Sequence, residues 1–299
     1  MHDAPPYGQP LTVGTDVVRV IAPNPSPMTY WGTNTYVLGT DCLAIIDPGP
    51  ASEDHRQALL AAIKGRPVSH IFVTHSHLDH SPLAAQLSRD LAAPVYAFGD
   101  SHAGRSAIMQ ELLRTGLSEG GEGRDETFAP DIHLHDGQTV SGPWGAMTAL
   151  HTPGHMANHM CFLFGEQLFV GDHVMGWASS LVSPPDGDLT DFMASCEKLM
   201  TVRAAVQHSG HGAPILQPQA RLRWLIDHRR ARERQIRAAL GAAPADARTL
   251  AKAIYADAPP ALLPAATRNV FAHLIDLYQR KTVTTEHVLS QDAVFEIRP

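Results

Sequence analysis

Three histidines and one aspartate fall within six consecutive positions of the stretch THSHLDH, residues 74–80. In an extended backbone alternate side chains point the same way, so His75, His77 and Asp79 are expected to share one face. His80 then follows at the turn into the next element, close enough to serve a second point a few ångströms away. Because imidazole and carboxylate groups are common metal ligands, the stretch predicts a metal-binding loop.

Further metal donors follow three later apolar runs. HTPGHMANH contains His155 after a Pro-Gly turn, LFVGDH contains Asp172 at a strand end, and VQHSGHG contains His211 between two glycines. Folds of the α/β class gather their sites at the carboxyl ends of strands. A catalytic metal also needs an open position, and two metals need more donors than four. We therefore expect a dinuclear centre.

The other histidines need a separate interpretation, because the chain has 18 of them. A lone histidine is more often a hydrogen-bonded or surface residue than a metal ligand. His151, His159, His173 and His208 lie next to the expected ligands in the sequence, so they are candidates for orienting ligands through hydrogen bonds, and none of the four is singled out.

The elements that must position these donors follow an α/β pattern. Between residues 33 and 212, short apolar runs alternate with segments of helical spacing, as in layered α/β folds. Residues 108–116 (IMQELLRTG) are compatible with a helix, and residues 118–126 (SEGGEGRDE) are expected to form a mobile loop. Expected strands are residues 34–38, 43–46, 70–74, 94–98, 147–151, 167–170 and 204–207, and expected helices are residues 51–64 and 81–91.

A change of charge near residues 212–219 indicates a second domain. Residues 1–218 carry a net charge of −12, and residues 219–299 carry +5. The later part begins with a long amphipathic helix, followed by helical segments at 249–255 and 261–279 and an alternating tail. This is the order of a winged helix. We therefore predict a catalytic domain at 1–218 and a winged-helix-like domain at 219–299.

Composition restricts the class and the compartment. Hydrophobic residues make up 44% of the chain and charged residues 18%, which is ordinary for a soluble globular protein. The first residues lack a secretory pattern, and no apolar run approaches the length that spans a bilayer. We expect a cytoplasmic protein with no membrane partner. Cys42, Cys161 and Cys196 form no close pair, so small buried thiols are expected rather than disulfides.

Taken together, THSHLDH, TPGH, GD and GHG resemble the metallo-β-lactamase superfamily over most of residues 30–215. The resemblance implies a four-layer αββα sandwich. It also implies that Asp172 bridges two metals and that Asp47, in IDPG, supports the metal loop. On this basis the first metal would bind His75, His77 and His155, and the second would bind Asp79, His80 and His211.

Within the superfamily the sequence looks like the glyoxalase II-type branch, because an aspartate and not a cysteine holds the bridging position. This disfavours β-lactamase activity, and the histidines of THSHLDH disfavour flavodiiron chemistry. The resemblance extends to a group of β-lactamase-like proteins typified by a mitochondrial endoribonuclease with a C-terminal winged helix. The segments that carry it are WGTNTYVLG, GDHVMGW, HRRARERQI and RNVFAHL.

Such a centre would be a zinc-dependent hydrolase in which a metal-bridging hydroxide is the nucleophile. Asp79 would orient that hydroxide and pass its proton to the leaving group. Two Zn²⁺ ions are expected, with iron or manganese as open alternatives, because the same donors suit all three. The oligomeric state is left open.

Three functions remain open at this point. One is hydrolysis of a small acyl substrate, a thioester or lactone; another is endoribonuclease cleavage of single-stranded RNA. The third lies outside hydrolysis: a mononuclear iron dioxygenase, or a winged-helix module that binds nucleic acid. The net charge of −12 on the catalytic part favours a small substrate and at most weak RNA contact. The third helix of the winged-helix-like domain is nearly neutral, which favours a packing or lid role over groove binding.

The substrate pocket is expected beside residues 176–189, a Pro- and Gly-rich segment that follows the bridging aspartate. Trp177 is the expected apolar wall, and Thr33 and Asn34 are expected to face the site from the opposite side. For all three residues, a purely structural role is the equal alternative.

Overall fold

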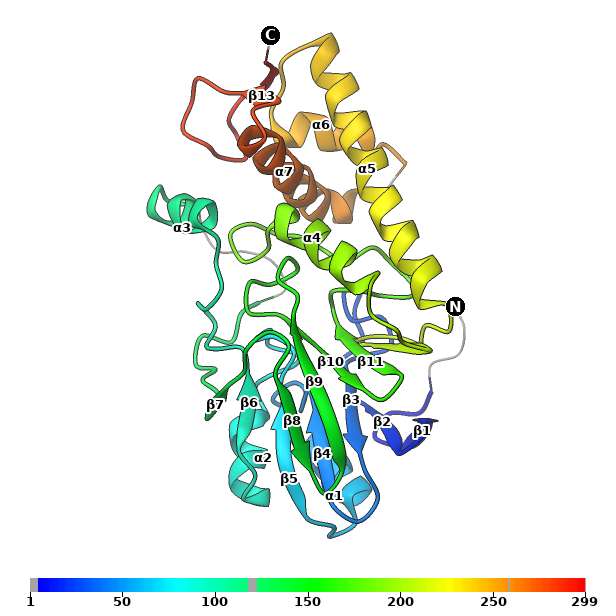
Figure 1. The fold of residues 1–299 in the computed structure, drawn as a ribbon. Coiled ribbons are helices and arrows are strands. Elements are labelled where there is room, and N and C mark those ends of the chain that lie inside the picture. Colours follow the sequence, from blue (N-terminus) through cyan, green and yellow to red (C-terminus); the bar gives the residue numbers. More distant parts are fainter. Residues whose placement is uncertain (1–4, 118–122, 258, 299) are drawn as a thin grey trace.

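The computed structural model describes residues 5–117, 123–257 and 259–298, and its first sheet has seven strands (Figure 1). Neighbouring strands are antiparallel from β1 to β4 and parallel from β4 to β7. In spatial order the strands are β1 (Leu11–Gly14), β2 (Val17–Ile21), β3 (Asn34–Leu38), β4 (Leu43–Ile46), β5 (Val68–Phe72), β6 (Val95–Ala97) and β7 (Ile132–His133).

The second sheet has five strands. Its order is β12 (Val206–Ser209), β11 (Gln167–Gly171), β10 (Met160–Phe164), β9 (Gly145–His151) and β8 (Thr139–Gly142). Only β11 and β12 are parallel to each other, so their carboxyl ends meet at one edge of the sheet. This is the edge that carries Asp172 and His211.

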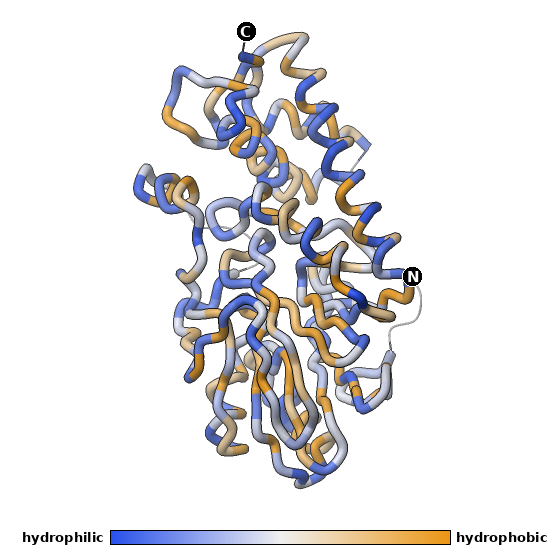
Figure 2. The backbone as a smooth tube through the Cα atoms, viewed as in Figure 1, coloured by the Kyte–Doolittle hydropathy of each residue, from blue (hydrophilic) through white to orange (hydrophobic). Residues whose placement is uncertain are grey.

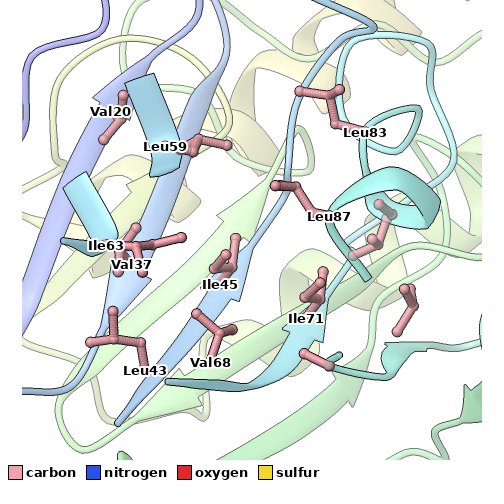
Figure 3. Close-up of a cluster of buried hydrophobic side chains, with 14 of the residues drawn as sticks. Val20, Val37, Leu43, Ile45, Leu59, Ile63, Val68, Ile71, Leu83 and Leu87 are labelled. Atoms are coloured by element: carbon pink, nitrogen blue, oxygen red, sulfur yellow. The ribbon is translucent and has the colours of Figure 1, made fainter. Parts of the chain in front are cut away.

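Alternating side chains of β3, β4 and β5 divide the core of this domain into layers. Tyr36, Ile46 and Phe72 point between the two sheets, where they pack with aromatic residues of the second sheet. Val37 and Ile45 point the other way, against α1 (Glu53–Ile63) and α2 (Ala84–Leu91). Figure 3 shows this outer cluster. The period-two pattern of these strands thus separates an inner layer from an outer one.

On the far side, α4 (Leu189–Leu199) and the first half of α5 (Pro218–Ala242) cover the second sheet. Leu222 and Leu225 of α5 pack there with Phe192 of α4. Together with α1 and α2 on the first sheet, they complete the four layers α, β, β, α. The predicted fold class is therefore confirmed.

The C-terminal part consists of helices and a short hairpin at the end of the molecule away from the β8–β9 turn (Figure 1). After α5 come α6 (Ala247–Ile254), the 3₁₀ turn η1 (Pro260–Leu262), α7 (Leu263–Gln279), and the paired strands β13 (Val283–Thr284) and β14 (Glu296–Ile297). The second half of α5 packs in this unit through Ile236 and Leu240. Hydrophilic and hydrophobic residues are interspersed along α5 (Figure 2). The hydrophobic residues of its first half pack in the sandwich and those of its second half pack in the C-terminal unit, so one helix contributes to two cores.

Helix α3 (Ala107–Arg114) also contacts the C-terminal unit, because Met109 and Leu112 belong to its core cluster. The expected helix at residues 108–116 is present, but it begins one residue earlier and ends two residues earlier. The segment expected to be a loop, residues 118–126, lies partly outside the described residues, at 118–122.

Several sequence expectations differ from the structure. The sequence did not predict strands β1, β2, β7, β8 and β10 or helix α4; β1 and β8 are largely exposed edge strands without a clear apolar alternation. Cys161 and Cys196 are buried as expected, but Cys42 is only half-buried, because it lies in the bend directly before β4. Within the described residues, every helix is too short or too polar to cross a membrane.

Candidate metal centre

The stretch THSHLDH leaves β5 and runs across the edge of the first sheet. Strand β5 ends at Phe72, and the chain stays extended only as far as His77, whose backbone pairs with Arg124. It then turns, with the His80 amide donating to the His77 carbonyl at 3.0 Å. The expected common face is therefore correct for His75 and His77 but wrong for Asp79, which the turn places in another donor group.

The first donor group contains His75, His77 and His155. His75 Nε2 lies 3.0 Å from His77 Nδ1, and His155 Nε2 lies 3.1 Å from the same atom. Gly154 turns the chain toward this group with φ +139°, and a side chain there would collide with the backbone of Phe192. His155 Nδ1 hydrogen-bonds to the carbonyl of Leu181 at 2.8 Å, which leaves Nε2 for a metal.

The second donor group contains Asp79, His80 and His211. Asp79 Oδ2 lies 3.3 Å from His80 Nε2 and 3.2 Å from His211 Nε2. His211 comes from the loop after β12, and its Nδ1 hydrogen-bonds to the carbonyl of Gly32 at 3.1 Å. Residues from the first sheet and from the second thus meet across the sandwich.

Asp172 lies between the two groups, directly after β11. Its Oδ1 is 3.4 Å from His80 Nε2, and its Oδ2 is 3.1 Å from His211 Nε2 and 4.0 Å from His155 Nε2. Gly210 lies against this carboxylate, where any side chain would overlap Asp172 Oδ1. The structure therefore brings all seven predicted ligands together, with Asp172 in contact with both groups.

Asp47 supports the centre from beneath. It follows β4 with a left-handed φ of 52°, and its Oδ2 accepts a hydrogen bond from His80 Nδ1 at 2.9 Å. The same carboxylate accepts bonds from the amide and the hydroxyl of Thr74 at 2.7 and 2.8 Å. The Thr74 hydroxyl in turn lies 2.9 Å from His75 Nδ1. Asp47 thus orients one histidine of each donor group, directly or through Thr74.

The two donor groups have opposite electrostatics. Burial, and then the neighbouring imidazoles, hold the pKa of His75 well below its usual range, and burial lowers the pKa of His77 to about 3. Burial also opposes charge on His80 and His211, but the carboxylates of Asp79 and Asp172 outweigh it. The pKa of His80 therefore lies well above its usual range, and that of His211 is raised to about 10. Cationic charge is favoured beside the carboxylates, and neutral imidazole in the first group.

This arrangement fits metal ions. Asp172 Oδ1 and His80 Nε2 are buried and have no hydrogen-bond partner in the described part of the chain. Buried polar atoms without partners are costly, and a cation between them would satisfy both. Metal binds neutral imidazoles and ionised carboxylates, so the first group has the binding form already, and in the second group a metal ion would replace the protons on His80 and His211. The donors suit zinc, iron or manganese equally.

A cavity of about 430 Å³ opens in front of the second donor group. Met28, Thr29, Pro50 and Leu78 form part of its wall, and Asp79 lies at its base. The Asp79 side chain is 19% exposed, whereas those of His80 and His211 are at most 1% exposed. Asp79 is therefore the second-group ligand most open to an incoming molecule.

The three residues expected to contact substrate lie in different places. The Thr33 hydroxyl donates to Asp79 Oδ2 at 3.0 Å. The amide of Asn34 is buried and donates to the carbonyls of Ser209 and Gly212, each at 3.0 Å, so it holds the loop of His211. Trp177 stacks on Tyr30 with ring centroids 4.8 Å apart, at the border of two apolar pockets.

Some positioning groups could not be found from the sequence. The carbonyls of Gly32 and Leu181, which hold His211 and His155, belong to the backbone and carry no residue signal. Thr74 could have been found, since it is the first residue of THSHLDH and directly precedes the first ligand.

An αββα sandwich in which seven donors from both sheets gather at one site defines a metal-binding protein of the layered α/β class. Residues 28–211 match the Metallo-beta-lactamase superfamily, and residues 247–287 match the Beta-lactamase associated winged helix domain. The chain therefore belongs to the metallo-β-lactamase superfamily and carries this winged helix domain at its C-terminal end. Both parts of the resemblance found in the sequence are confirmed.

Relatives match most of the chain. It is 32% identical over 270 residues to an "Atrochrysone carboxyl ACP thioesterase" of Aspergillus fumigatus, which covers 88% of this chain and 76% of that protein. It is 30% identical over 280 residues to "Beta-lactamase-like protein 2 homolog" of Drosophila melanogaster, with 88% of each chain covered. A beta-lactamase domain protein from Burkholderia ambifaria shares the fold, with a TM-score of 0.79, 21% identity, and 99% and 96% of the two chains covered.

Proposed function

We propose that this protein is a dinuclear metal-dependent hydrolase that acts on a small acyl substrate, a thioester or a lactone. The observation that carries this proposal is the position of Asp172, which lines the cavity beside Asp79 and lies within 4.0 Å of ligands from both donor groups. The name of the Aspergillus fumigatus relative, a thioesterase, supports an acyl substrate.

The chain's side chains would hold two ions, which we propose to be zinc. His75, His77 and His155 would bind one, and Asp79, His80 and His211 the other, with Asp172 shared between them. When bound, such ions lower the pKa of water and polarise the substrate oxygen. The hydrogen bonds to Leu181, Gly32 and Asp47 fix the imidazole rings, so the ligands need little reorganisation during turnover.

Asp79 would carry the proton of the attacking water to the leaving group. Its Oδ2 is fixed by the Thr33 hydroxyl, and its side chain borders the cavity. In thioester hydrolysis the oxygen of water bonds to the acyl carbon, the carbon–sulfur bond breaks, and the water proton passes to the leaving thiolate. A carboxylate held at the cavity base can accept that proton and release it to sulfur.

The test combines metal analysis of the purified protein with an activity panel of thioesters, lactones and single-stranded RNA. We expect two equivalents of zinc, thioester or lactone turnover, and loss of that turnover on chelation. His77→Ala removes a ligand and should abolish activity. His135→Ala is the matched control, since His135 is exposed and distant in sequence from every ligand. Full turnover in His77→Ala would refute the proposal.

Two other outcomes correspond to the alternative functions. RNA cleavage that is lost in His77→Ala would identify an endoribonuclease, and one iron with oxygen consumption would identify a dioxygenase. The arginine-rich run of α5 gives the RNA alternative little support. Arg229 is buried, and the exposed Arg230 and Arg237 each face a glutamate, Glu197 and Glu233.

A further inference from the structure

A second cavity lies between the metal domain and the C-terminal domain. Its volume is about 240 Å³, and its lining is almost entirely apolar. Met175, Trp177 and Leu181 come from the segment that follows Asp172, whereas Leu262 and Ala266 come from η1 and α7. Both domains are therefore needed to form it.

Two residues in this wall, Asn269 and Tyr255, are held by neighbours outside the cavity. Asn269 Oδ1 accepts hydrogen bonds from Arg229 Nη1 at 3.0 Å and from the Val182 amide at 3.3 Å. The guanidinium of Arg232 lies 4.1 Å from the ring centroid of Tyr255. These contacts fix the wall, so the cavity is suited to an apolar group with few polar atoms.

The apolar cavity adjoins the metal centre. Met28 lines both this cavity and the cavity at Asp79. Leu181, in the apolar wall, accepts the hydrogen bond from the metal ligand His155. A substrate whose reacting carbon lies at Asp79 can therefore extend past Met28 into the space between the domains.

We propose that this interdomain cavity binds the apolar acyl group of the substrate, and this inference rests on the function proposed above. An apolar cavity of about 150 Å³ can hold benzene, so the larger space here suits an acyl group of hexanoyl or benzoyl size. The winged helix domain then acts as one wall of the substrate site. Through this wall, the winged helix domain would make the enzyme select thioesters with apolar acyl groups.

The experiment compares hexanoyl and acetyl thioesters of N-acetylcysteamine. The hexanoyl chain has four more methylene groups than the acetyl group, and burial of each contributes about 0.8 kcal/mol. We therefore expect kcat/KM to be about 10²-fold higher for the hexanoyl thioester than for the acetyl thioester. Ala265→Trp on α7 would fill the cavity without touching a metal ligand, and it should reduce the preference to near 1. Ala178→Phe fills the cavity from the metal-domain side and should have the same effect, so the test does not depend on the correct folding of Ala265→Trp alone. Ala253→Trp, exposed on α6 outside the lining, is the control and should keep the wild-type preference.

A binding measurement separates this inference from the proposed function. N-hexanoylcysteamine, an amide, should change the fluorescence of the protein through Trp177, and N-acetylcysteamine at the same concentration should not. This difference should be absent in Ala265→Trp. If both amides behave alike, or if Ala265→Trp keeps the hexanoyl preference, the inference is wrong even if thioesters are hydrolysed. Selective binding without hydrolysis of any thioester or lactone would support the cavity and refute the proposed function.

Discussion

Replacing Gly210 by alanine should disable the metal centre without changing any ligand. The backbone of Gly210 has no positive φ, so alanine can adopt it. A Cβ atom there would lie 2.7 Å from His80 Cε1 and still closer to Asp172 Oδ1. Since ordinary contact begins near 3.4 Å, the carboxylate must move by about 1 Å. A displacement of about 1 Å can cost about 10²-fold in rate, and disturbed ligand support costs about 10–100-fold in metal affinity.

The assay measures metal stoichiometry after dialysis and kcat/KM on the best thioester. We expect Gly210→Ala to lose metal first and to retain about 1% of wild-type kcat/KM when saturated with metal. Gly241→Ala is the matched control, because nothing lies within 4 Å of its added Cβ atom on α5. That variant should keep full activity and gain about 0.5–1 kcal/mol in stability. Wild-type metal content and turnover in Gly210→Ala would refute the placement of Asp172 between the donor groups.

Three further predictions concern catalysis and stability. Asp79→Asn should lower kcat by about 10²–10⁴-fold in metal-loaded protein, and near-normal turnover would remove Asp79 from proton transfer. Burial lowers the pKa of His55 to about 4, so its contribution to stability is complete above pH 6.5 and is lost as pH falls toward 4. In denaturant unfolding, the free energy of unfolding of the wild type should fall by up to about 1.4 kcal/mol per pH unit as the pH is lowered from 6.5 toward 4, and His55→Gln should fall less steeply. An equal pH dependence in the two proteins would contradict this prediction. Arg229→Met removes charged donors from Ser180 and Asn269 and should lower the free energy of unfolding by about 1–3 kcal/mol. The exposed Arg230→Met should change it by less than about 0.5 kcal/mol, and equal losses would show that burial of Arg229 contributes nothing.

The positions of the metal donors could be predicted because ligand chemistry is a property of side chains. Each proposed ligand is a histidine or aspartate after an apolar run, so both its type and its place are visible in the sequence. The layered fold could be predicted for the same reason, since β4 is apolar throughout and the buried strand β3 ends in the apolar residues Tyr36–Leu38.

The geometry between donors could not be predicted in the same way. The turn at residues 78–80, which moves Asp79 away from His77, depends on backbone hydrogen bonds. The exposed edge strands β1 and β8 lack the apolar pattern that identifies β3. The interdomain cavity depends on residues more than 200 positions apart, such as Met28 and Ala266, and no local pattern relates them.

Helix α5 contributes to the cores of both domains, which predicts that the two domains unfold together. Leu222 and Leu225 belong to the core of the sandwich, and Ile236 and Leu240 belong to the core of the winged helix domain. Because one continuous helix contributes to both, melting either core would remove packing from the other. A chain cut at the charge boundary near residue 218 would keep α4 on the second sheet but lose the apolar cover that Leu222 and Leu225 of α5 provide, and an exposed apolar surface promotes aggregation. The winged helix domain is thus a part of the folding unit of the metal domain as well as a wall of its site.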